Sequence, residues 1–221
     1  MVEDKGPTQE MIWEKSYSSK RDFFGNEPSE FGIRSAEVLK RHNLKKLLEL
    51  GCGQGRDTVM FLKNGFEVTA IDYCQTGLDQ LQECTSCNGL IKNLRLCRID
   101  AKAGLPFPDS SFDAVYSHMF FTMEFTEEEM GRIMDEVKRV LRPGGYNIYS
   151  VRSDKDPHYG KGKHCGEDMY QNQMGFIVHF FTEEKIKRLS KGWEILSIRQ
   201  SVEGSYPFDK YLYEVTMRRP R

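Results

Sequence analysis

Apolar residues recur along this chain at two periods, and segments with the two periods alternate. Short apolar runs that end in glycine or aspartate predict strands, and longer segments with helical spacing predict helices. The strands are expected at 45–50, 66–72, 94–99, 114–117 and 146–151, and the helices at 56–63, 75–87 and 127–140. This alternation predicts a parallel sheet with right-handed crossovers and helices on both faces.

Two helices are predicted before the first strand, over 10–21 and 30–41, and Ser29 is expected to cap the second. Trp13 and Tyr17 lie near one side of the first helix. We interpret residues 1–34 as a flap over the open end of the sheet, with Trp13 and Tyr17 contacting the substrate. Alternatively, the first helix simply packs on the core.

The alternation breaks over residues 152–181. A polar loop at 152–164 is too long for a simple connection, and loops of this length are usually functional or disordered. We expect a substrate lid, with Arg152, Tyr159 and His179 contacting the substrate, although each of the three also suits an ordinary structural position. An apolar run at 175–181 predicts a strand, followed by a helix over 183–190 with Glu184 and Lys185 exposed. Two final strands are expected from 192 and at 211–217.

Composition limits the classes of function. The chain has 221 residues and a net charge of −1, so nothing attracts it globally to nucleic acid or anionic lipid. No apolar run is long enough for a membrane helix, and the first residues lack the apolar core of a signal peptide. We therefore expect a cytoplasmic monomer or homodimer with six reduced cysteines. Cys84 and Cys87 form a lone C-x-x-C without a second pair, and no metal site is predicted.

Glycines stand at alternate positions where the first strand should meet its helix: Gly51, Gly53 and Gly55. Glycine tolerates positive φ and lets a ligand approach the backbone closely. A dinucleotide fingerprint would have a third glycine at Arg56. Glu49 would repel a pyrophosphate but would pair with an ammonium group. The loop therefore favours S-adenosylmethionine, which carries a cationic amino acid and no phosphate.

Three segments carry a family resemblance. Residues 49–55 (E-L-G-C-G-Q-G) resemble motif I of the class I S-adenosylmethionine-dependent methyltransferases, and residues 105–113 (L-P-F-P-D-S-S-F-D) and 141–145 (L-R-P-G-G) are similar to two later signatures. The resemblance implies an α/β fold with a Rossmann-like, seven-stranded, mostly parallel sheet in a three-layer sandwich. Strand seven would run antiparallel between strands five and six. The methyltransferase domain would span 35–221.

Acidic residues after the next two strands complete the expected cofactor site. Asp72 follows the glycine loop by about 20 residues, a spacing at which a carboxylate accepts hydrogen bonds from a ribose. Tyr73 is expected to stack on the adenine, and the resemblance assigns Asp100 and Ala101 to the adenine as well. Cys52 and Ser117 are further cofactor contacts that we expect. The product would be S-adenosylhomocysteine.

The predicted reaction is in-line displacement of the methyl group by a small-molecule acceptor. Part of the sequence is similar to the tellurite-resistance type of small methyltransferase. His118, His158 and His164 are candidate bases for a nucleophile that carries a proton. Alternatives are a tRNA or protein acceptor, or a cofactor-binding module without turnover. A nucleic-acid acceptor is disfavoured by the near-zero net charge. Glu49 counts against a nicotinamide oxidoreductase.

Overall fold

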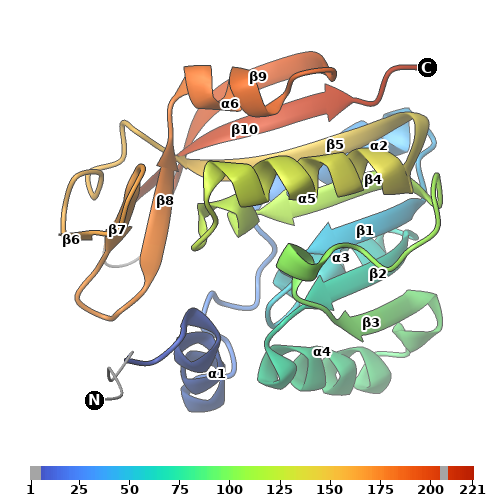
Figure 1. Cartoon of the computed structure of the whole chain (residues 1–221). Helices are drawn as coiled ribbons and strands as arrows, with labels where there is room; N and C mark the ends of the chain where they lie inside the picture. Colours follow the sequence, from blue (N-terminus) through green and yellow to red (C-terminus); the bar gives the residue numbers. More distant parts are fainter. Residues whose placement is uncertain (1–5, 205–208) are drawn as a thin grey trace.

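The computed structural model describes residues 6–204 and 209–221, and its centre is one sheet (Figure 1). Five strands run parallel in the order β3-β2-β1-β4-β5. Their bounds are Lys46–Leu50 (β1), Glu67–Asp72 (β2), Leu94–Arg98 (β3), Phe112–His118 (β4) and Leu141–Ser153 (β5). Beyond β5, β10 (Lys210–Arg218) lies antiparallel between β5 and β9 (Glu194–Glu203). The expected insertion of the last strand is confirmed.

Three further strands extend the sheet beyond the expected seven. β8 (Ile177–Phe181) pairs in parallel with the last two residues of β5. It carries two short antiparallel strands, β7 (Met169–Gln171) and β6 (Lys163–His164). The segment expected as a lid, 152–181, therefore includes a small ribbon, which projects from the sheet beside the carboxyl end of β5 (Figure 1).

Helices cover both faces of the sheet. The helices α2 (Glu30–Arg41), α3 (Arg56–Lys63) and α4 (Gln75–Cys87) share one apolar core, and their bounds agree with the sequence prediction. The helices α5 (Glu127–Val140) and α6 (Glu183–Leu189) pack on the other core. Side chains cap several of these helices as expected, with Ser29 at α2, a capping box at α5 and Thr182 at α6.

A buried carboxylate ties α2 and α3 to the sheet. Asp57 accepts from the amide nitrogen of Ser29 at 2.7 Å and from its hydroxyl at 2.8 Å. The hydroxyl of Tyr116 on β4 donates to the same carboxylate at 2.7 Å. Because α3 starts directly after the glycine loop, this network also fixes the loop relative to β4.

The first helix, α1 (Gln9–Ser19), packs against α4. Glu14 accepts from the amide nitrogens of Gln75 and Thr76, which begin α4, at 2.6 and 3.2 Å. Among residues 6–204 and 209–221, no helix combines the length and hydropathy that crossing a membrane requires.

Candidate functional site

The glycine loop between β1 and α3 is held to the end of β2. Gly51, Gly53 and Gly55 have φ angles of 69°, 53° and 84°, a region that favours glycine. Asp72 accepts from the amide nitrogen of Gly53 at 2.8 Å through one carboxylate oxygen, and from that of Cys74 at 2.8 Å through the other. Burial raises the pKa of Asp72, and the backbone hydrogen bonds oppose this effect. Each oxygen keeps a second lone pair for a ligand hydroxyl.

Glu49 is a buried carboxylate beneath the loop. It accepts one hydrogen bond, from the hydroxyl of Thr58 at 2.6 Å. Burial raises the pKa of Glu49 to about 8, and the charges of Asp57 and Asp72 act in the same direction. A cation beside Glu49 would relieve this cost by favouring the charged form.

Aromatic side chains lie directly over the loop. A Cβ atom added at Gly53 would lie 2.7 Å from the hydroxyl oxygen of Tyr17, and one added at Gly51 would lie 2.8 Å from the ring of Phe120. Tyr17 is buried, and its ring lies 5.4 Å from that of Trp13 on the same helix, tilted by 40°. The ligand-facing side of the loop is therefore covered by α1 and by the residues after β4.

The other expected cofactor residues line the carboxyl ends of neighbouring strands. Cys52 is buried within the loop, and Tyr73 is half-buried after β2. Asp100 caps a short 3-10 helix that starts at Ala101, and it lines a pocket of about 420 Å³. The hydroxyl of Ser117 is buried and has no hydrogen-bond partner in the described part of the chain.

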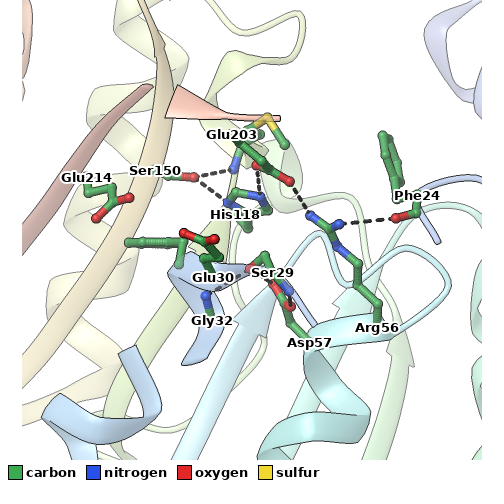
Figure 2. Close-up of polar contacts among 12 residues, drawn as sticks. Phe24, Ser29, Glu30, Gly32, Arg56, Asp57, His118, Ser150, Glu203 and Glu214 are labelled. Carbon is green, nitrogen blue, oxygen red and sulfur yellow. Dashed lines mark hydrogen bonds and ion pairs between the residues drawn. The ribbon is translucent and has the colours of Figure 1, made fainter. Parts of the chain in front are cut away.

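His118 is held by two polar neighbours at the end of β4 (Figure 2). Its Nδ1 lies 2.6 Å from the hydroxyl of Ser150, and its Nε2 lies 2.8 Å from the carboxylate of Glu203 on β9. Arg56 reaches the other oxygen of Glu203 at 2.9 Å. Burial alone would raise the pKa of Glu203, but the His118 and Arg56 contacts hold it well below its ordinary range.

The structure does not gather the expected lid residues into one cluster. The guanidinium of Arg152 forms two hydrogen bonds with Asp156, at 2.6 and 2.7 Å, and His158 lies beside this pair. Tyr159 donates to Asp168 at 3.0 Å on the ribbon, and His164 is exposed, with Nε2 at 2.8 Å from a backbone carbonyl oxygen. Arg152 and His158 contact each other directly, whereas Tyr159 meets Arg152 across the ring of Phe180 and is linked to His179 through Asp168 and Lys185.

His179 and Lys185 form a buried polar pair. The Nδ1 of His179 donates to the carbonyl of Phe125 at 2.7 Å, and its Nε2 accepts from Lys185 at 2.7 Å. Lys185 also donates to Asp168 at 2.6 Å. The prediction that Lys185 is exposed was wrong, because this ion pair compensates the burial of its charge; Glu184 is exposed as expected. Burial and Lys185 lower the pKa of His179 to about 4, so its surroundings match the structural alternative.

Sequence reasoning missed Glu203 and Lys210 as members of this region. They face each other across β9 and β10, at the carboxyl edge of β4 and β5. Their signal in the sequence is weak, since both are single charges at the ends of ordinary strands. In the sequence, Arg56 stands out only because it replaces the third glycine of a dinucleotide fingerprint.

Comparison with known proteins identifies the family. Residues 48–149 match the model of the methyltransferase domain family. This match covers just under half of the chain, so we assign the methyltransferase family to this segment. Over its whole length, the chain also superimposes, at a TM-score of 0.73 and 18% identity, on 98% of the 1,6-didemethyltoxoflavin-N1-methyltransferase of Burkholderia thailandensis, which was crystallised with S-adenosylhomocysteine.

The curated relatives of this chain differ in the acceptors that their names give. The chain is 24% identical to the probable S-adenosyl-L-methionine-dependent methyltransferase TehB of Haemophilus influenzae, across 91% of this chain and 65% of the relative. It is 25% identical to the tRNA N(3)-cytidine methyltransferase METTL2 of Danio rerio, across 65% of this chain and 43% of the relative. The chain thus spans less than two thirds of either relative.

The residues around the loop fit the cofactor of this family. In the described part of the chain, Thr58 is the one donor to the buried Glu49, whose pKa is raised, and both features suit an ammonium partner. The buried hydroxyl of Ser117 lacks a partner among the described residues. The glycines lack side chains where Tyr17 and Phe120 approach the loop. A ligand that occupied the same space would displace these two side chains.

Proposed function

We propose that this chain transfers a methyl group from S-adenosylmethionine to a small-molecule acceptor at the carboxyl ends of β4 and β5. The observation that carries the proposal is the combination of a glycine loop, a buried acid beneath it and acids after the next two strands. The proposed arrangement has residues 35–221 as the catalytic domain, residues 1–34 as a flap, and residues 152–181 as a lid.

Each part of the cofactor would meet a different group. Glu49 would pair with the ammonium group, Asp72 would accept from the ribose, and Asp100 with Ala101 would contact the adenine. Further contacts would come from Gly51, Cys52, Gly53, Gly55, Tyr73 and Ser117. The cofactor supplies an electrophilic methyl group on a sulfonium, which is already a good leaving group. The task left to the protein is therefore alignment and exclusion of water.

Contacts between the flap and the lid support a small acceptor. Trp13 on α1 lies 4.6 Å from Phe176, the residue before β8, measured between ring centroids. The side chain of Gln9 donates to the carbonyl of Gly175 at 2.9 Å and accepts from the amide of Ile177 at 3.0 Å. The two segments together cover the carboxyl edge of the sheet, an arrangement that suits an enclosed small molecule better than a folded RNA.

Where the nucleophile carries a proton, His118 would accept it at Nδ1, through the hydroxyl of Ser150 that lies 2.6 Å away. Glu203 accepts from its Nε2, and a carboxylate in this position stabilises a protonated imidazole. A sulfur or neutral amine nucleophile attacks through its own lone pair and would not need this step. His158 and His164 lie on the lid, so His118 is the base that we propose.

The test pairs cofactor binding with turnover. We expect the purified chain to bind S-adenosylmethionine in calorimetry and to release S-adenosylhomocysteine with one or more members of a metabolite panel. Asp72→Ala should weaken cofactor binding at least tenfold, whereas Asp79→Ala, at an exposed position on α4, should bind like the unaltered chain. Equal affinity of the two variants would refute this placement of the site.

A tRNA acceptor is the second candidate, because METTL2 is among the relatives. The same release assay with unmodified tRNA and no metabolite separates the two candidates. Turnover on tRNA but on no member of the panel would replace the small-molecule proposal.

A further inference from the structure

Lys210 is a half-buried cation beside the proposed acceptor site. It lies directly opposite Glu203 in the β9–β10 pairing. The carboxylate of Glu203, however, is bound by His118 and Arg56. Among the described residues, no carboxylate forms an ion pair with the Lys210 ammonium, and no hydrogen bond reaches it. Lys210 differs in this respect from Arg56 and Arg152, which each form an ion pair with a carboxylate.

Two guanidinium groups surround the same position, and both have carboxylate partners. Arg56 pairs with Glu203, and Arg152 pairs with Asp156. The amide nitrogen of Tyr211, next to Lys210, donates to Asp156 at 2.9 Å, which ties the start of β10 to this cluster. Among the described residues, Arg56 and Arg152 thus each form an ion pair with a carboxylate, whereas Lys210 forms none.

The environment of Lys210 makes its charge costly. Its ammonium lies 5.3 Å from the ring centroid of Phe24, and the guanidinium of Arg56 lies 5.9 Å from the same centroid. Burial lowers the pKa of Lys210; Arg152 and Arg56 add to this effect, while Glu203 and Asp156 oppose it. A bound anion would reduce this cost.

The cluster lies within one continuous set of contacts that leads to the glycine loop. Phe24 lies 5.9 Å from Trp13, which contacts Tyr17, whose hydroxyl lies over Gly53. Glu203 lies opposite Lys210 and contacts His118, the proposed base, so Lys210 lies beside the proposed acceptor site. A polyanion would meet the two carboxylates of the cluster as well as its cations.

We infer that the methyl acceptor is a small organic acid with one negative charge, whose carboxylate pairs with the ammonium of Lys210. This inference rests on the proposed methyltransferase function. It adds a substrate class and a specificity-determining residue that lies outside the glycine loop and its acids.

Matched acid and amide acceptors test the substrate class. Release of S-adenosylhomocysteine is measured with 4-hydroxybenzoate against 4-hydroxybenzamide, and with thioglycolate against thioglycolamide. We expect kcat/KM to favour the acid at least tenfold in one or both pairs. Lys210→Gln should lower kcat/KM for the acid about tenfold or more, mainly through KM, and so remove the preference for the acid over the amide, because a lost charged hydrogen bond costs about this factor. Lys210→Arg should keep most of the preference.

A binding measurement tests Lys210 without turnover. Benzoate is titrated calorimetrically into the full chain, with and without S-adenosylhomocysteine. Lys210→Met keeps the apolar stem over Phe24 and guards against misfolding, and Lys161→Gln on the exposed part of the lid is the matched control. We expect benzoate binding to be lost in Lys210→Met and kept in Lys161→Gln.

The outcomes separate the two proposals. A chain that binds no S-adenosylmethionine refutes the proposed function, while loss of benzoate binding in Lys210→Met would still support the anion site. Equal benzoate affinity in Lys210→Met and the unaltered chain overturns the inference, even if methyl transfer occurs. Equal use of acid and amide, or turnover on tRNA alone, also overturns it.

Discussion

The buried carboxylate of Glu49 should make the stability of this chain depend on pH. Its pKa is raised by burial from an ordinary value of about 4.5 to about 8. Between these values the folded chain keeps a proton that the unfolded chain has released, so the free energy of unfolding falls as pH rises and levels off above about 8. Each pH unit corresponds to about 1.4 kcal/mol, so the full cost is roughly 5 kcal/mol.

Glu49→Gln removes the charge but keeps the shape and an oxygen that accepts from Thr58. We therefore expect the variant to be more stable than the unaltered chain at pH 8, and close to it at pH 5. Urea unfolding at pH 5, 6, 7 and 8 gives the free energies. Glu67→Gln, an exposed carboxylate at the start of β2, is the control that should leave the pH dependence unchanged. Parallel pH curves for Glu49→Gln and the unaltered chain would refute the reasoning.

Cofactor binding should reverse this cost. An ammonium beside Glu49 favours the carboxylate, so below pH 8 binding should release a proton and the affinity should increase with pH. Calorimetry in two buffers with different ionisation enthalpies counts the proton. Glu49→Gln should bind S-adenosylmethionine at least tenfold more weakly and release none. Unchanged affinity in this variant would show that Glu49 does not meet the cofactor.

Three further substitutions probe the surrounding networks. Asp57→Asn should lower the free energy of unfolding by about 2 to 3 kcal/mol in urea titrations, because a buried acceptor of three hydrogen bonds loses its charge. Lys185→Met should lower the free energy of unfolding by roughly 3 kcal/mol in the same titrations. It should also raise the pKa of His179 from about 4 in an NMR titration, because a neighbouring cation is removed. An unchanged His179 titration would contradict this. Glu203→Gln should slow methyl transfer to a proton-bearing acceptor more than tenfold without changing cofactor affinity, and an equal loss in both would indicate a structural role instead.

Local signals explain how much of the fold was predictable. The three helices over 30–41, 56–63 and 75–87 have the predicted bounds, because a capping serine, glycines and asparagines mark their ends in the sequence. The ribbon of β6 to β8 was only partly expected. Its strands pair through contacts that the spacing of apolar residues does not predict. Even β8, predicted as an apolar run, gave no indication that it would extend β5.

The residues of the candidate site also divide into those that the sequence predicts and those that it does not. Glu49, the glycines and Asp72 lie within one strand–turn–helix–strand segment, so their spacing alone indicates that they meet. Glu203 and Lys210 follow this segment by more than a hundred residues, and they reach it only because β10 inserts beside β5. Lys185 shows a further limit. A lysine on a short helix is expected in solvent, and its burial depends on Asp168 across a tertiary contact.

In the proposed arrangement, the position of Tyr17 links cofactor entry to the proposed lid. Its hydroxyl covers Gly53, so a cofactor that occupied the same space would move α1, or at least this side chain. The same helix contacts the start of α4 through Glu14 and the lid through Gln9 and Trp13. Hydrogen bonds of this kind contribute only about 1 kcal/mol each, so an open arrangement of α1 is energetically accessible. Because one helix makes both sets of contacts, cofactor binding that shifts α1 must also change how the lid is held.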